Sequence, residues 1–306
     1  MGKSMNSSSR ELTLGRKITM NMDKYVMLLP FFVLFFVFTI LPVISSIFLS
    51  VTSFNLLETP QFVGLNNYIK LFLEDEIFVK AISKTIVFAV ITGPISYIAC
   101  LFIAWLINEL SPILRALLTL LFYAPTLSGN LYIIWKLIFS GDMYGWANGL
   151  LMSFGIINEP ILWLSDPRYN FTIIIMVQLW LSLGTGFLAF IAGLQSVDRT
   201  LYEAAAIDGI RSRFQELFYV TIPSMGPQLL FAGILQISTS FAVGRICIDL
   251  AGMPSTDYSA HTIITHAIDY GTIRYEMGYA SAIATVLFII MLIINKMVHK
   301  VLAKYL

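Results

Sequence analysis

A short polar stretch interrupts a strongly apolar chain. It reads Glu-Ala-Ala-Ala-Ile-Asp-Gly from Glu203 to Gly209 and continues to Thr-Ile-Pro at Thr221 to Pro223. Long apolar runs flank it on both sides, but the stretch itself is too polar to lie among lipid tails. We expect a helix, a glycine break and a second short amphipathic helix here, where a membrane protein would meet a cytosolic partner.

The residues of this stretch carry helix start and stop signals. Thr200 and Glu203 have the spacing of a capping box, in which each side chain bonds the other residue's backbone N–H. The alanines that follow make a narrow helical face, and Gly209 ends the helix because glycine readily adopts a positive φ. A second helix should then present an apolar stripe at the i, i+3 and i+4 positions Phe214, Leu217 and Phe218.

Composition predicts an all-α polytopic membrane protein. Of the 306 residues, 58% are hydrophobic and only 12% are charged, against about 25% charged residues in a soluble domain. The net charge of +1 and the absence of a basic tract argue against nucleic-acid binding. Cys100 and Cys247 fit small apolar packing residues better than a disulfide. The first apolar run is too long for a cleaved signal peptide and should stay in the lipid bilayer.

Six apolar runs are long enough to cross a bilayer, which takes about 20 residues. Twelve of the nineteen Lys and Arg residues lie on the side of the two termini, which predicts that both termini are cytoplasmic. We therefore expect a cytoplasmic tail at 1–24 and a membrane domain at 25–306, in which the 195–226 loop is cytoplasmic. The predicted spans are Tyr25–Thr52, Ala81–Ile107, Leu114–Ile138, Phe171–Leu194, Pro227–Ile248 and Gly278–Val301.

Signatures of chemistry within this chain are absent from the sequence. There is no Gly-x-x-x-x-Gly-Lys-Ser/Thr phosphate loop and no His-Glu-x-x-His zinc motif. His261 and His266 are five residues apart and do not share a helical face, so we interpret them as ordinary residues of an extracytoplasmic loop and predict no metal site. Basic residues such as Lys136 and Arg245 lie near span ends, where long side chains reach the interface.

The spans carry neutral polar and aromatic groups instead of buried charges. Amides donate to and accept from hydroxyls, and aromatic faces pack on sugar rings, so a path for a neutral polyol is plausible. Hydrogen bonding between helices is the simpler role for each residue taken singly. The candidates for a substrate path are Tyr123, Asn130, Gln178, Gln236 and Ser240.

At the polar stretch the chain resembles the membrane subunit of binding-protein-dependent ABC importers of the maltose and oligosaccharide type. That family carries Glu-Ala-Ala-x-x-x-Gly followed by Ile-x-Leu-Pro, which Glu203 to Gly209 and Val220 to Pro223 match with a spacing one residue longer than usual. Weaker likenesses are Phe62 to Tyr68, Tyr123 to Pro125, Trp163 to Pro167 and Tyr275 to Ala282.

The resemblance implies a type I ABC importer permease fold in the cytoplasmic (inner) membrane of a prokaryote. It also implies a second permease subunit, in a heterodimer, an extracytoplasmic solute-binding protein that delivers a sugar, and two ATPase subunits that use ATP and Mg. This chain would bind no cofactor and catalyse no reaction. The residues that would contact the ATPase are Glu203, Ala204, Ala205, Gly209, Arg211, Arg213, Phe214 and Phe218.

Two other classes of protein compete with this interpretation. A secondary transporter or channel for a neutral polar solute would work without ATP, but an ion-coupled carrier usually needs buried charge that the spans lack. An intramembrane enzyme would need a catalytic cluster, and the sequence contains none that we recognise. The Glu203 to Gly209 motif favours the importer subunit over both.

Overall fold

The computed structural model describes residues 21–129 and 132–305, and the chain divides into two compact units after Phe48. In the first unit, α2 (Met22–Phe35), the one-turn π-helix η1 (Phe36–Ile40) and α3 (Leu41–Leu49) follow one another without a break. None of their residues is buried, and together they form a 28-residue apolar helix. A helix that is apolar all round and this long matches a membrane span.

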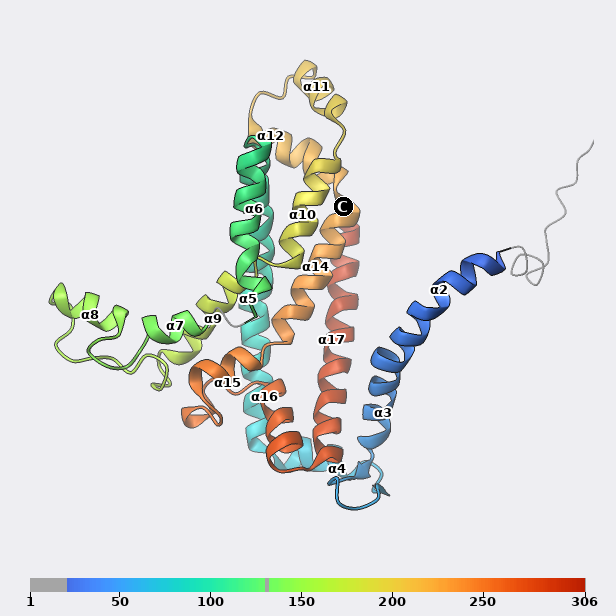
Figure 1. Ribbon diagram of the computed structural model, residues 1–306, viewed down its shortest axis with the longest axis vertical. Helices are drawn as coiled ribbons and strands as arrows, with labels where there is room; N and C mark the ends of the chain where they lie inside the picture. Colours follow the sequence, from blue (N-terminus) through green and yellow to red (C-terminus); the bar gives the residue numbers. More distant parts are fainter. Residues whose placement is uncertain (1–20, 130–131, 306) are drawn as a thin grey trace, which may run out of the picture. The chain divides into compact units, whose positions relative to one another are not determined.

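The second unit is a bundle of helices (Figure 1). Its strands are β1 (Thr52–Ser53) and β2 (Gln61–Phe62), an antiparallel pair. Its helices up to the 195–226 loop are α4 (Asn66–Ile69), η2 (Lys70–Glu74), α5 (Glu76–Asn108), α6 (Pro112–Leu127), α7 (Ile133–Ile138), α8 (Trp146–Ser153), α9 (Asn170–Leu181) and α10 (Thr185–Ser196). The remaining helices are α11 (Arg199–Ile207), α12 (Arg213–Glu216), η3 (Leu217–Thr221), α13 (Ile222–Ser224), α14 (Gly226–Phe241), α15 (Arg245–Ala251), η4 (Thr256–Tyr258), α16 (Ile263–Ile268), η5 (Asp269–Ile273) and α17 (Met277–Tyr305).

The core of the bundle lies among α5, α10, α14 and α17, which run side by side (Figure 1). Small residues bring these helices close together, as is typical of helix packing in membranes. A Cβ atom on Gly93 would stand 3.5 Å from the Ser240 hydroxyl, and one on Gly233 would stand 3.6 Å from the Tyr97 ring. Helices α5 and α14 are therefore in direct contact at both glycines.

The structure differs from the six predicted spans in their continuity. Among the residues that the structure describes, four helical stretches are long and apolar enough to cross a membrane: Met22–Leu49, Glu76–Asn108, Asn170–Ser196 and Met277–Lys304. A fifth is a pair, Arg213–Ser224 and Gly226–Phe241, bent by 85°. The predicted third run is divided into α6 and α7, and the predicted fifth run into α14 and α15. Gly129 lies in the first break, and Gly244 lies in the second. Glycine disfavours a continuous helix because it loses the most backbone entropy when a helix forms.

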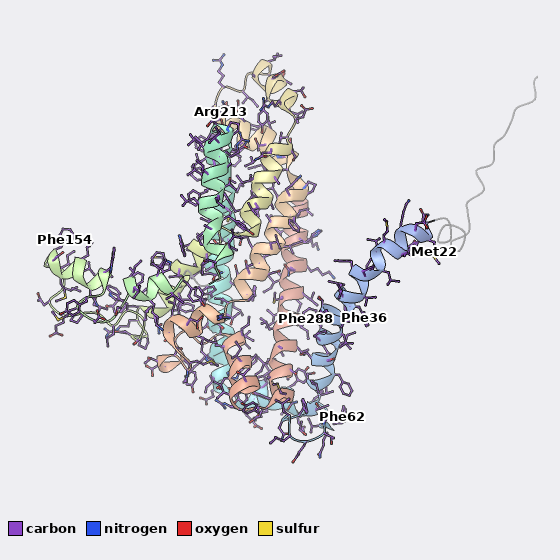
Figure 2. The ribbon with its side chains drawn as sticks, in the orientation of Figure 1. Met22, Phe36, Phe62, Phe154, Arg213 and Phe288 are labelled. Carbon is purple, nitrogen blue, oxygen red and sulfur yellow. The ribbon has the colours of Figure 1, made fainter. Side chains whose placement is uncertain are left out.

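Residues 140–163, here called the arm, extend from the bundle through α8, with Phe154 near its far end (Figure 2). Buried Asn148 holds the arm together with both ends of its side-chain amide. Its Nδ2 donates to the carbonyls of Ser140, Asp142 and Ile161 at 3.0–3.1 Å. Its Oδ1 accepts from the Ile161 N–H and from the Trp163 indole at 3.1 and 2.8 Å. An amide with all of its groups bonded fixes the fold of a segment.

Candidate functional site

The 195–226 loop begins with a helix that is capped differently from the prediction. Helix α11 starts at Arg199, and its N-cap is Asp198, whose carboxylate accepts the Thr200 N–H at 3.0 Å. That hydrogen bond holds the pKa of Asp198 below its usual value. The predicted capping box of Thr200 and Glu203 is therefore wrong, because the carboxylate one residue before the helix already fills the cap. Glu203 is left exposed on the helix surface.

The predicted end of this helix is confirmed. Gly209 has φ +95°, a left-handed conformation that favours glycine. The Ile210 N–H donates to the Ala205 carbonyl at 3.0 Å, and the Gly209 N–H donates to the Ala206 carbonyl at 3.3 Å. These two bonds form a Schellman motif, which satisfies the last carbonyls of α11 and turns the chain sharply toward α12.

A capping box does exist in the loop, at the start of α12. The Ser212 hydroxyl accepts the Gln215 N–H at 3.2 Å, and the Gln215 side chain accepts the Ser212 N–H at 3.3 Å. The same Gln215 oxygen accepts the Arg211 N–H at 3.1 Å. Sequence reasoning missed this cap, although Ser-x-x-Gln is a capping-box pattern.

The apolar residues of the second helix divide between the interior and the surface. Of the predicted stripe, Leu217 is buried, whereas Phe214 and Phe218 are 58% and 62% exposed. The Phe214 ring lies 5.2 Å from the Trp105 ring of α5, which holds the loop against the bundle. Two phenylalanines thus remain available on the outer surface of the loop.

The other predicted contact residues of the loop gather at the same end of the bundle, where Figure 2 labels Arg213. Ala204 and Arg211 are exposed, whereas Ala205 is buried. Arg213 pairs with Glu216 at 2.8 Å and with Glu109 of the α5 C-cap at 3.6 Å. The loop therefore offers an exposed acidic residue, exposed cations and exposed aromatic rings on two short capped helices.

A small polar cavity of ≈ 110 Å³, here called the amide cavity, lies where α9 ends and α10 begins. Of the five predicted path residues it brings together two, Gln178 and Gln236. The Gln236 Nε2 donates to the Ser182 carbonyl at 3.3 Å and approaches the Cys100 Sγ at 3.1 Å. The complete lining of the amide cavity is Thr126, Gln178, Leu181, Ser182, Gly184, Gly186, Leu235, Gln236 and Thr239.

The other predicted path residues do not line this cavity. Ser240 is buried and donates to the Gln236 carbonyl at 2.7 Å, as a helix-packing residue does. Tyr123 is half-buried on α6, and Asn130 lies outside the described residues. Sequence reasoning missed Thr126, which lies three residues after Tyr123 on α6 and therefore almost on the same face.

The interpretation of the histidines as ordinary loop residues is wrong. His261 and His266 are both buried, and His261 Nε2 lies 3.0 Å from His266 Nδ1. His266 Nε2 lies 3.0 Å from the Asp75 carboxylate, which also accepts the Tyr279 hydroxyl at 2.8 Å. Asp75, His261, His266, Tyr270 and Tyr279 are here called the histidine cluster. The sequence analysis did not predict the histidine cluster because Asp75 lies far from both histidines in the sequence.

Burial controls protonation in the histidine cluster. It lowers the pKa of His261 to about 4 and lowers the pKa of His266 as well. Burial by itself raises the pKa of Asp75, but hydrogen bonds from the Phe78 N–H and the Tyr279 hydroxyl hold it below its usual value. The two imidazoles are therefore neutral, and the carboxylate is ionised, at neutral pH. Within residues 21–129 and 132–305, no three His, Cys, Asp or Glu side chains are placed to hold a metal ion.

Comparison with known proteins defines the class of protein. No protein-family model matches the chain. It is 31% identical over 289 residues to the probable ABC transporter permease protein YesP of Bacillus subtilis (strain 168), covering 92% of this chain and 90% of that protein. It is 32% identical over 216 residues to the lactose transport system permease protein LacF of Rhizobium radiobacter, covering 70% and 71%. These relatives are membrane subunits of transporters.

The chain belongs to the family of ABC transporter permease proteins, as the Glu203 to Gly209 motif predicted. It is an integral protein of the cytoplasmic membrane. The trehalose/maltose transport system permease protein MalF of Thermococcus litoralis is 29% identical over 272 residues, which are 88% of this chain and 89% of that protein. A crystal structure of a bacterial ABC transporter for the acidic polysaccharide alginate has the same fold, with a TM-score of 0.77 at 22% identity over 95% of this chain and 98% of that chain.

Proposed function

We propose that this chain forms half of the membrane pathway of an ATP-driven importer for an oligosaccharide. The observation that carries the proposal is the 195–226 loop, with two capped helices and exposed Glu203, Phe214 and Phe218 at one end of the bundle. Relatives that transport lactose, trehalose and maltose, or arabinooligosaccharides support a sugar substrate. A relative of the same fold in complex with a substrate-bound periplasmic protein supports delivery by a binding protein.

In this proposal the chain spans the membrane six times with both termini in the cytoplasm. Its partners are a second, related permease subunit, two cytosolic ATPase subunits and an extracytoplasmic solute-binding protein. ATP and Mg are used by the ATPase subunits, and this chain binds no cofactor. The N-terminal tail is residues 1–24, and the permease domain is residues 25–306, with its cytoplasmic loop at 195–226.

The loop transmits motion by lying in a groove of an ATPase subunit. The Schellman turn at Gly209 sets the angle between α11 and α12, so a force on one helix passes to the other. Arg213 and Phe214 connect the loop to α5, through Glu109 and Trp105. Closure of the ATPase dimer would therefore reach the long helices of the bundle by direct contact, which is alternating access driven by mechanical coupling.

Sugar hydroxyls would meet the amides of Gln178 and Gln236 along the pathway. Each amide can donate and accept, which suits a neutral hydroxyl that does both. The amide cavity also contains the hydroxyls of Thr126 and Thr239. Tyr123 and Asn130 remain predictions for the same pathway, and Ser240 supports Gln236 from the next helical turn.

Reconstitution of the complete transporter in proteoliposomes tests the proposed coupling. Gly209→Pro removes the Schellman N–H, and Glu203→Lys reverses an exposed charge without disturbing a cap. We expect each variant to lose ATP hydrolysis stimulated by the binding protein, while the subunit stays in the membrane. Glu159→Lys, an exposed charge reversal outside the loop, is the control. Full stimulation in both loop variants would refute the role of the loop.

A further inference from the structure

A second cavity, of ≈ 260 Å³, lies between α7 and α15 and is lined by charged side chains of both helices. Its lining is Tyr132, Ile133, Lys136, Arg245, Asp249 and Leu250. Two cations and one carboxylate therefore face one space, here called the charged cavity. None of these residues belongs to the amide cavity or to the 195–226 loop.

The charges of this cavity do not balance. Arg245 Nε pairs with Asp249 Oδ2 at 3.5 Å, and the Tyr132 hydroxyl donates to the same oxygen. The Arg245 side chain nevertheless remains 80% exposed, because one carboxylate oxygen occupies only part of a guanidinium with five N–H donors. Lys136 has no ion-pair partner among the residues that the structure describes. The cavity thus has an excess positive charge.

We infer that the charged cavity binds the carboxylate of an acidic saccharide, such as a uronic acid residue, on its way through the transporter. This inference rests on the proposed function and names the class of its substrate. Lys136 and Arg245 supply charge-assisted donors for a carboxylate. Asp249 accepts hydrogen bonds only, so it suits the hydroxyl groups of the same ligand. A ligand that brings both an anion and hydroxyl donors satisfies all three side chains.

Two tryptophan rings pack together beside α7, and neither of them lines the charged cavity. Trp135 precedes Lys136 on α7, and its ring lies 5.6 Å from the Trp180 ring of α9 in an edge-to-face arrangement. Trp180 is two residues from Gln178 on α9, on a different face of the helix from the amide cavity. A phosphate headgroup of a lipid would meet the same cations, so a lipid is the alternative occupant that the experiment must separate from a saccharide.

Uptake by the complete transporter in proteoliposomes tests the inference, with digalacturonate, its dimethyl ester and maltose as probes. The ester keeps the shape of the acid and removes its charge. We expect ATP-dependent uptake of digalacturonate in preference to the ester and maltose. Lys136→Ala and Arg245→Ala should each lower uptake of the acid about tenfold, which corresponds to one charge-assisted hydrogen bond. Lys84→Ala, which removes a lysine stacked on the Phe171 ring outside the cavity, should leave uptake unchanged.

The other outcomes separate this inference from the proposed function. Uptake of maltose or the ester without the acid, or acid uptake unaffected by Lys136→Ala and Arg245→Ala, would overturn the acidic substrate and leave the importer intact. No ATP-dependent uptake of any probe would overturn both. A lipid site is tested in vesicles of phosphatidylglycerol and of phosphatidylcholine. If the double variant removes a stabilisation specific to phosphatidylglycerol and leaves acid uptake unchanged, the cavity binds a lipid headgroup and the inference fails.

Discussion

The 195–226 loop and the histidine cluster are built by opposite means. The caps of the loop join residues two to five positions apart, such as Asp198 to Thr200 and Ser212 to Gln215. The histidine cluster joins Asp75 to His266 and Tyr279 across 191 and 204 residues. Because these caps join residues within the loop, the ends of α11 and α12 stay ordered while the loop moves as a unit. Long-range bonds tie α5, α16 and α17 together, so this region resists separation of the helices.

The largest expected contrast is between glycines of the two regions. In Gly278→Ala, next to the histidine cluster, the new Cβ would overlap the Thr52 carbonyl oxygen and lie 3.0 Å from the Phe54 nitrogen. Backbone atoms cannot rotate away, so we expect a destabilisation of about 3 kcal/mol. In Gly209→Ala no atom lies within 4 Å of the new Cβ, and only the positive φ costs energy, about 1 kcal/mol.

The apparent Tm of the purified subunit in detergent measures both variants. Gly278→Ala should lower the Tm clearly more than Gly209→Ala does. Equal losses, or a larger loss for Gly209→Ala, would show that the loop is as tightly restrained as the histidine cluster.

The second contrast is in pH dependence. The ordinary histidine pKa is 6.5, and burial lowers the pKa of His261 to about 4 in the folded protein. The unfolded chain therefore binds protons first, and stability falls as the pH decreases from about 6.5 to about 4. Asp75 contributes stability that is lost only below its own ordinary pKa of 3.8, because its folded pKa is lowered. The histidines thus dominate between pH 4 and 6.5.

Thermal unfolding between pH 7.5 and 4.5 checks this expectation. The Tm should fall with pH in the unmodified protein and fall less in His261→Gln, in which the buried titrating group is absent. His299→Gln, a change at an exposed histidine of α17, should leave the pH profile unchanged. A Tm that falls equally in His261→Gln would place the titrating group elsewhere.

The smallest expected effect is at the cap of α12. Ser212→Ala removes the acceptor of the Gln215 N–H and should cost about 1 kcal/mol, confined to the loop. Hydrogen exchange of the Gln215 amide should then accelerate about fivefold, with no change in the Tm of the bundle. Ser153→Ala in the arm, where the hydroxyl donates to the Leu150 carbonyl, is the matched control. A lower global Tm in Ser212→Ala would mean that the loop and the bundle unfold together.

The difference between local and long-range contacts explains which features the sequence could predict. The family and the glycine end of α11 follow from the short motif from Glu203 to Gly209, and the helical membrane class follows from composition and the apolar runs. The true N-cap, Asp198, lies two residues before the Thr200 to Glu203 pattern. The histidine cluster could not be predicted, since nothing near Asp75 indicates that His266 would contact it. The breaks at Gly129 and Gly244 lie within apolar runs, where hydropathy alone does not distinguish a span from two short helices.

The buried amide of Asn148 has a consequence for how quickly the arm can be recognised. Residues 143–158 contain no charged side chain, and Trp146 and Phe154 are 77% and 71% exposed. Because Asn148 already orders the segment, a molecule that contacts these rings loses little conformational entropy in the encounter. Association at the arm should therefore be limited by diffusion and orientation, with no slow ordering step before the contact forms.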